Sequence, residues 1–266
     1  MRPFLKWAGG KYRLIERIQA KLPPGERLLE PFSGSCALSI NSTYHHYWLN
    51  DINNDLICVY QTIQKEGPSF IEFCGSYFTG KANTPEKYYA LRKQFNAEKD
   101  LRTKSALFIY LNRHGYNGLC RYNASGEFNV PFGKYKKPYF PEKELLYFYE
   151  KFKQATFGSL DFEEMMMRAK PGDVIYCDPP YIPLNTTSNF TEYSSGGFGM
   201  EDQVRLAKVA MKLARKGIKT VISNHYNDFI IDTYRNAQIE IFPVRRFISC
   251  DGDNRNPVDE VLAVFG

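Results

Sequence analysis

The sequence predicts an α/β fold built on an open, mostly parallel sheet. Short apolar runs that indicate buried strands alternate with longer stretches of helical periodicity. An acidic residue stands at or just after the end of most of these runs, and a mainly helical block, residues 52–155, interrupts the alternation. The expected strands are Arg27–Glu30, Tyr47–Asn50, Phe157–Phe162, Val174–Cys177 and Ile218–Ser223.

Length and composition restrict the class of protein. With 266 residues, 43% of them hydrophobic, the chain is long enough for one large domain, or one domain with a sizeable insertion. No run approaches the roughly 18 apolar residues of a transmembrane helix, and the N-terminus lacks the apolar core of a secretion signal. The six cysteines show no CxxC spacing and the four histidines form no ligand pattern, so we predict reduced cytosolic thiols and no metal. A net charge of +6 is compatible with a polyanionic partner.

The loop Asp178-Pro179-Pro180-Tyr181 follows the expected strand Val174–Cys177 and organises the rest of the chain. Ligands of open α/β sheets bind at the carboxyl ends of strands. Two prolines remove two backbone donors, so their carbonyl oxygens stay available as acceptors beside a carboxylate and an aromatic ring. That set suits a planar heterocycle with an exocyclic amino group, stacked on Tyr181. A plain strand-to-loop turn with a capping Asp explains four residues equally well.

The N-terminal segment Phe4–Lys11 leads into an expected helix, Tyr12 to Lys21. Its Gly-Gly-Lys is not a phosphate loop, because Tyr12 replaces the Ser or Thr and Leu5 replaces the first glycine. Trp7 is either a core residue or a platform for a purine, with Lys11 placed to pair with a carboxylate.

A small-residue turn, Pro31-Phe32-Ser33-Gly34-Ser35, joins the first strand to a helical stretch that runs through Ile40. Asp51 follows Gly34 by 17 positions, close to the roughly 20 that place an acid on a ribose hydroxyl. The glycine pattern is not GxGxxG, so a dinucleotide is disfavoured. Asp51, Asp161 and Asp178, together with Glu30, are expected to form a row of acids at strand ends, which favours a ligand rich in hydroxyl and amino groups.

Helical periodicity within residues 52–155 predicts helices at Ile52–Lys65, Pro85–Glu98 and Thr103–Arg113. From Arg113 to Lys137 there are five Lys or Arg against one acid, interleaved with five aromatic residues, and Asn123–Gly126 predicts a hairpin turn. Basic and aromatic side chains in this arrangement suit a reader of nucleic acid, although a solvated hairpin is the commoner structure for such composition. Beyond the block, Glu201–Lys216 predicts an amphipathic helix with Val204, Ala207, Met211 and Ala214 as its apolar stripe.

In several segments and in their order, the chain resembles the DNA adenine-N6 methyltransferases that modify GATC, the Dam family. The resemblance runs from Phe4 to about Leu262, and its most specific pieces are Phe4–Lys11, Glu30–Gly34, Asn112–Asn123, Gly126–Lys137 and Asp178–Tyr181. It implies a Rossmann-like fold that uses S-adenosylmethionine. Residues 1–54 and 156–266 would form the catalytic, cofactor-binding domain, and residues 55–155 the target-recognition insertion with its hairpin.

The resemblance also implies roles for single residues. Asp178, Pro179 and Tyr181 would act on a flipped adenine. The cofactor would be held by Trp7, Lys11, Phe32, Asp51, Asp161, Phe162 and Asp178. Tyr116 would wedge into the duplex and Asn117 would fill the space of the flipped base, while the remaining contacts to bases would come from Lys6, Leu119, Arg121, Pro131 and Tyr135.

The chain departs from this family at Asp251–Pro257, where relatives tend to carry a Gly-rich, basic loop. That departure concerns DNA contacts rather than chemistry. Methylation of cytosine N4 or of an RNA amino group remains an alternative reaction, and a DNA-binding module with an inactive cofactor pocket is an alternative class. The expected partner is double-stranded DNA, with no membrane, and the chain is expected to be a monomer in the cytoplasm of a bacterial or phage-infected cell.

Overall fold

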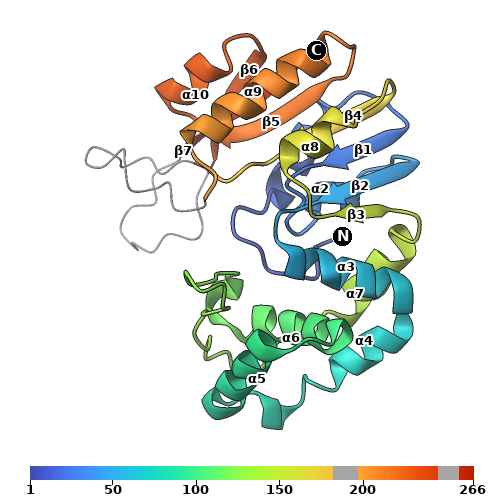
Figure 1. Ribbon diagram of the computed structural model, residues 1–266, viewed down its shortest axis with the longest axis vertical. Helices are drawn as coiled ribbons and strands as arrows, with labels where there is room; N and C mark the ends of the chain where they lie inside the picture. Colours follow the sequence, from blue (N-terminus) through green and yellow to red (C-terminus); the bar gives the residue numbers. More distant parts are fainter. Residues whose placement is uncertain (182–196, 245–257) are drawn as a thin grey trace. The chain divides into compact units, whose positions relative to one another are not determined.

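A computed structural model describes residues 1–181, 197–244 and 258–266 of the chain. Its strands form one sheet in the order β3-β2-β1-β4-β5-β7-β6 (Figure 1). β4 pairs in parallel with β1 and β5, and β2 pairs in parallel with β3, whereas β7 runs antiparallel to both β5 and β6. The strands are β1 Arg27–Glu30, β2 His46–Asn50, β3 Thr156–Gly158, β4 Asp173–Cys177, β5 Thr220–His225, β6 Gln238–Val244 and β7 Val258–Phe265. This arrangement confirms the predicted open, mostly parallel sheet.

Helices account for much of the rest of the described chain, and several begin at residues that cap them. Asn53 accepts a hydrogen bond from the backbone of Leu56, and Asp100 accepts one from Thr103. The helices are α1 Ile15–Gln19, α2 Ala37–Asn41, α3 Asn54–Glu66, α4 Pro68–Gly75, α5 Pro85–Ala97, α6 Leu101–His114, α7 Glu142–Lys151, α8 Phe162–Met167, α9 Met200–Ala214 and α10 Asp228–Thr233. None of these described helices is long and apolar enough to cross a membrane.

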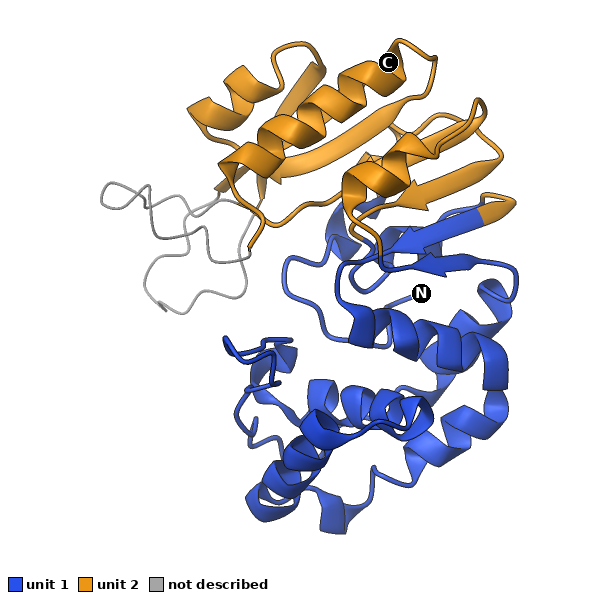
Figure 2. Ribbon diagram, in the orientation of Figure 1, with its two compact units in different colours: residues 1–15, 33–43, 47–159 blue, residues 16–32, 44–46, 160–266 orange. Residues whose placement is uncertain are grey.

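The chain divides into two compact units (Figure 2). Unit 1 contains residues 1–15, 33–43 and 47–159, and unit 2 contains residues 16–32, 44–46 and 160–266. The expected division into residues 1–54 with 156–266 and an insertion of residues 55–155 stays a prediction.

In unit 1, α3 packs against α4, α6, α7 and β3, and α5 packs against α6. Its core is aromatic: the Tyr60 ring lies 5.9 Å from Phe4 and 4.8 Å from Phe148, centroid to centroid. At the end of α6, the buried His114 ring stacks on Tyr110 at 3.9 Å and lies 5.1 Å from Phe78.

In unit 2, α9 packs on β5 and β7 and contacts both α8 and α10. All five residues of β4 are buried, as a parallel strand covered on both faces requires. β4 and β5 are in register with Cys177 opposite Ile222, so the residues that follow these two positions emerge beside one another at the carboxyl ends of the strands.

Two predicted boundaries are wrong. The strand expected at Phe157–Phe162 ends at Gly158, and Asp161 instead caps α8, where its carboxylate accepts a hydrogen bond from the backbone of Glu163 at 2.9 Å. An Asp followed by two Glu is a helix-start pattern, and it prevails over the apolar residues around it. The helix expected at Tyr12–Lys21 begins as a 3₁₀ turn, Tyr12–Leu14, and ends at Gln19.

Candidate functional site

Asp178 begins the loop after β4, and hydroxyl groups from inside unit 2 hold its carboxylate. Ser223, near the end of β5, donates its Oγ hydrogen to Asp178 Oδ1 at 2.8 Å. The same Oγ lies 3.0 Å from the hydroxyl of the buried Tyr176, two residues before Asp178 on β4. The parallel register of β4 and β5 brings these groups together. One oxygen of the carboxylate is therefore fixed by the strand core before any ligand arrives.

A second anchor reaches the loop from α9. Gln203 is fully buried and donates its side-chain amide to the carbonyl oxygen of Pro180 at 3.1 Å. Its own oxygen accepts hydrogen bonds from the Tyr234 hydroxyl at 2.7 Å and from the Asn224 amide at 3.0 Å. A buried polar cluster is tolerated only when its members satisfy one another, as these do. The loop is thus held at two points, the side chain of Asp178 and the carbonyl of Pro180.

Tyr181 ends the loop with its ring packed edge-on against His225, 4.1 Å between centroids. Burial raises the pKa of the Tyr181 phenol well above its ordinary value, and the nearby Asp178 charge raises it further. The side chain is therefore a neutral aromatic surface beside a carboxylate, which suits a stacked ring better than proton transfer.

Asp161 and Phe162 belong to an aromatic group in unit 2. The Phe162 ring lies 5.4 Å from Phe32 and 5.5 Å from Phe198. Arg205, on α9, grips both Asp161 oxygens at 3.0 and 2.9 Å, and its guanidinium lies 4.2 Å from the Phe162 ring centre. Asp161, Phe162 and Phe32 are therefore together, as the sequence predicted, although Asp161 reaches its place as a helix cap.

In unit 1, Trp7 and Asp51 both meet the turn at Gly34. A Cβ added to Gly34 would lie 2.6 Å from the indole nitrogen of Trp7, and the φ of +43° is itself a conformation that favours glycine. Asp51 Oδ2 accepts a hydrogen bond from the Gly34 backbone at 2.9 Å, and Oδ1 accepts one from Asn53 at 3.0 Å. Burial raises the pKa of the Asp51 carboxyl above its ordinary value, although these two backbone donors act against the shift.

Two further polar groups belong to this part of unit 1. The ammonium of Lys11, a mostly buried residue, donates to the carbonyl of Gly9 at 2.8 Å. The Ser33 hydroxyl is buried in the turn without a hydrogen-bond partner among the described residues. An unsatisfied buried hydroxyl is unfavourable, and a polar ligand above the turn would relieve it.

The hairpin turn at Asn123–Gly126 is confirmed. The backbone N–H of Gly126 donates to the carbonyl of Asn123 at 2.9 Å, and the Asn123 side chain accepts bonds from Ser125 and Glu127. Just before the turn, Arg121 is exposed, and its Nε donates to the Asn129 side chain on the opposite arm at 2.8 Å.

The other residues expected to contact DNA gather around the 3₁₀ turn Tyr116–Gly118. Tyr116 is 51% exposed and donates its backbone N–H to Pro131, while Leu119 donates to Tyr116. The Tyr135 hydroxyl accepts the backbone N–H of Asn117 at 3.0 Å. Lys6 places its ammonium 3.8 Å from the centre of the Tyr135 ring. These six residues are therefore neighbours, whereas the bonds of Arg121 are made within the hairpin, to Asn129.

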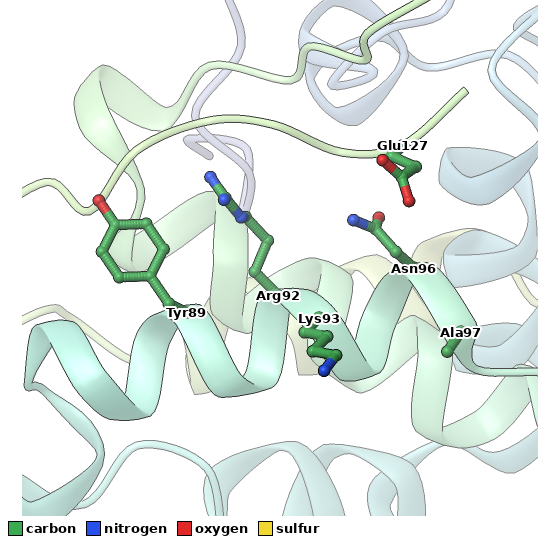
Figure 3. A pocket seen from close by; sticks show the side chains of 6 residues that line it. All are labelled: Tyr89, Arg92, Lys93, Asn96, Ala97 and Glu127. Atoms are coloured by element: carbon green, nitrogen blue, oxygen red, sulfur yellow. The ribbon is translucent and has the colours of Figure 1, made fainter. Parts of the chain in front are cut away.

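A pocket of about 500 Å³ runs along α5, beside the hairpin (Figure 3). Figure 3 shows Arg92 and Asn96 pointing from α5 toward the chain that carries Glu127. Asn96 exchanges two hydrogen bonds with the backbone of Phe128, at 3.2 and 2.9 Å, and Arg92 donates to the carbonyl of Val130 at 3.0 Å. None of the predicted site residues lines this pocket, and its polar side chains hold the hairpin in place.

Sequence reasoning missed Ser223 and Gln203, which support the loop, and Arg205, which holds Asp161. Ser223 had a usable signal, because it is the polar residue that ends a predicted strand beside the Asp178 strand. Gln203 was missed because the predicted apolar stripe of α9 was misplaced. Of Val204, Ala207, Met211 and Ala214 only Ala207 is buried, and the buried residues of the helix are Gln203, Leu206, Ala207, Val209, Ala210 and Leu213. Arg205 had no signal in its local sequence.

Residues 1–181, 197–244 and 258–266 contain no group of three or more His, Cys, Asp or Glu placed to hold a metal. The five cysteines in these ranges are free thiols. The loop Asp251–Pro257, where the sequence departs from the family pattern, lies outside the described residues.

Comparisons with known proteins identify the family. Residues 7–246 match the profile of the D12 class N6 adenine-specific DNA methyltransferases. DNA adenine methylases from Vibrio cholerae and Escherichia coli K12 are 49% and 46% identical over 99% of this chain and 96% and 95% of their own lengths. The enzyme of the same name from Serratia marcescens is 44% identical over 99% of this chain and 98% of its length. With a family match over residues 7–246 and relatives that are 44–49% identical over 99% of its length, this chain belongs to the D12 class of N6 adenine-specific DNA methyltransferases.

Proposed function

We propose that this enzyme methylates N6 of the adenine in GATC, in double-stranded DNA, with S-adenosylmethionine as the methyl donor. The family supplies the adenine N6 chemistry. The names of the relatives and the match of segments Asn112–Asn123 and Gly126–Lys137 to GATC-methylating enzymes support the choice of site.

One observation carries the proposed mechanism: the Asp178 carboxylate is fixed by Ser223 in a loop whose next residues are Pro-Pro-Tyr. The N6 lone pair is delocalised into the purine ring, which makes it a poor nucleophile. Hydrogen bonds from the two N6 protons to Asp178 and to the Pro179 carbonyl would localise the lone pair on nitrogen. Preorganised acceptors achieve this at little reorganisation cost. Tyr181 would stack on the flipped ring and offset part of the few kcal/mol that flipping costs.

The turn at Gly34 fits an adenosyl cofactor. A ligand with a ring and hydroxyl donors would suit three groups at this turn. These are the Trp7 indole, the unsatisfied Ser33 hydroxyl and the Asp51 carboxylate, whose burial is unfavourable. S-adenosylmethionine, when bound, supplies an electrophilic methyl group. By the family resemblance, Asp51 would bind the ribose, and the other residues proposed to hold the cofactor are Trp7, Lys11, Phe32, Asp161, Phe162 and Asp178.

For DNA, we propose that the exposed Tyr116 enters the duplex and that Asn117 occupies the space of the flipped base. The base contacts would come from Lys6, Leu119, Arg121, Pro131 and Tyr135. The enzyme would act as a monomer in the cytoplasm of a bacterial or phage-infected cell.

The test is methylation of plasmid DNA by the purified chain, followed by digestion with nucleases that differ in their tolerance of methylated GATC. Nucleoside analysis of the product separates N6-methyladenine from N4-methylcytosine, and a parallel RNA substrate tests the RNA alternative. Calorimetric titration with S-adenosylmethionine addresses the inactive-module alternative, because such a module would give no binding heat. Methylated adenine outside GATC, or no binding heat, contradicts the proposal.

A further inference from the structure

Asn112, on α6, is a buried residue whose amide group joins two separate segments of unit 1. Its Oδ1 accepts the backbone N–H of Lys6 at 2.9 Å. Its Nδ2 donates to the carbonyl of Lys6 at 2.8 Å and to the carbonyl of Gly118 at 3.1 Å. Asn112 is only 2% exposed, so each of these bonds replaces water that the amide has lost. The side chain therefore fixes the Lys6 backbone to the turn Tyr116–Gly118.

Gly118 also packs closely against Lys6. A Cβ added to Gly118, at φ +63°, would lie 2.2 Å from the Cβ of Lys6, which only glycine permits. Beyond this contact, the Lys6 ammonium lies over the Tyr135 ring, and Tyr135 accepts the N–H of Asn117. Lys6 is thus held at its backbone by Asn112 and at its charged end by Tyr135.

The position of Lys6 is electrostatically unfavourable in the protein alone. Burial lowers the pKa of its ammonium, and the charge of Arg113 lowers it further. A cation kept partly desolvated beside another cation gains from an acceptor-rich partner. Guanine offers O6 and N7 in the major groove, which are suitable acceptors for a lysine held in one place.

We infer that Asn112 is a specificity-positioning residue, which holds Lys6 against the turn Tyr116–Gly118 so that its ammonium meets one base of the site. The inference rests on the proposed function, in which Lys6 contacts a base. Asn112 itself contacts no DNA. Replacing Asn112 should therefore change sequence preference in the same way as replacing Lys6. It should differ from replacing Arg121, which lies on the hairpin.

The experiment compares kcat/KM on GATC duplexes and on a panel in which each base pair is replaced in turn. Lys6→Ala defines the pair that Lys6 reads, and Arg121→Ala defines a different pair. We expect Asn112→Ala and Asn112→Ser to reduce discrimination about tenfold at the Lys6 pair and to change the other pairs less than about threefold. Calorimetry with S-adenosylmethionine reports, independently of turnover, whether each variant is folded.

Asn96→Ala is the matched control, because Asn96 exchanges the same kind of paired bonds with the backbone of Phe128, but on the hairpin. It should leave preference at the Lys6 pair unchanged. Gly118→Ala forces a Cβ against Lys6 at the junction that Asn112 holds, while the Asn112 side chain itself is kept. It should therefore give the Lys6 profile as well, and it tests the junction if the Asn112 variants do not fold.

Several outcomes overturn the inference. It fails if the Asn112 variants weaken every duplex by one factor, follow the Arg121 profile or leave preference unchanged. It also fails if Asn96→Ala relaxes the Lys6 pair equally, or if Lys6→Ala itself changes no preference. If the unmodified chain shows no preference for GATC, the proposed function fails too, and that result is visible before any variant is made.

Discussion

The loop Asp178–Tyr181 and the hairpin Arg121–Asn129, which we propose carry catalysis and sequence reading, are stabilised in different ways. The loop Asp178–Tyr181 is held by side chains that are distant in sequence: Ser223 lies 45 positions away and Gln203 lies 23 from its partner. The turn of the hairpin Arg121–Asn129 is closed by its own backbone and by Asn123, and Asn96 on α5 attaches the second arm through two bonds to the backbone of Phe128. The difference indicates that the chemistry depends on a buried polar framework, whereas sequence reading depends on a locally folded, exposed surface. The two can therefore be altered separately.

The largest effect is expected at the loop itself. Asp178→Ala removes the acceptor that activates N6 and should slow methyl transfer by at least about a hundredfold, comparable with losing one preorganised hydrogen bond to a transition state. Single-turnover kinetics with saturating DNA measure it, and thermal unfolding shows that the fold is kept. Residual turnover within about tenfold of the parent would end the assignment of Asp178.

A change in the reading segment should alter preference and spare chemistry. Arg121→Ala should cost about 1–3 kcal/mol of discrimination at one G·C pair of the site, because arginine is suited to take guanine O6 and N7 together. Methylation rates on GATC and on single-mismatch duplexes measure the loss. Lys136→Ala is the control: Lys136 is an exposed basic residue that is not among the proposed base contacts. If it binds a phosphate, its loss should weaken all duplexes alike and make the salt dependence shallower. A common slowing of all duplexes by Arg121→Ala would show that Arg121 positions the backbone.

The framework that supports the loop should have an intermediate effect. Ser223→Ala removes the hydrogen bond to Asp178 Oδ1 and should lower kcat about tenfold, near the smaller end of the ~1.5–3 kcal/mol assigned to bonds with charged groups. The KM values for DNA and for cofactor should stay close to those of the parent, because Ser223 is buried beneath the loop and acts through Asp178. Ser223→Thr keeps a hydroxyl and should recover most of kcat. If the threonine variant is as slow as the alanine variant, packing rather than the hydroxyl is responsible.

The smallest effect is a pH dependence at Asp51. Burial raises the pKa of this carboxyl, and hydroxyl donors of a bound ribose would favour its ionised form. Cofactor affinity should therefore fall a few-fold as the pH drops from neutrality through that raised pKa, with release of protons on binding. Calorimetry at several pH values measures both quantities. The Asp51→Asn variant should bind the cofactor more weakly, and its affinity should not vary with pH in this way. If its affinity falls with pH as steeply as that of the parent, the titrating group is another residue.

The difference between local and distant contacts also explains which parts of the structure the sequence could predict. The β1 and β4 strands, α3, α5, α6, α9 and the hairpin turn follow from local periodicity and turn residues, and they lie close to their predicted positions. The antiparallel pair β6 and β7 and the short helices α8 and α10 depend on packing against distant elements. The contacts of Gln203 with Pro180 and of Arg205 with Asp161 arise only when α9 meets the sheet. These two contacts could not be predicted from the local sequence.

The buried His114 gives the DNA-reading part of unit 1 a built-in sensitivity to acid. Burial lowers the pKa of its imidazole to about 4, against about 6.5 in an unfolded chain. Between these values the opened segment takes up a proton that the folded segment refuses, so the contribution of His114 to stability is complete above about pH 6.5 and disappears by about pH 4. The whole interval corresponds to about 3 kcal/mol. In this range protons bind the opened form preferentially. The protection factors of the α6 amides, which compare observed with intrinsic exchange rates, should therefore fall with acidity, and they should not fall in this way when His114 is replaced by phenylalanine.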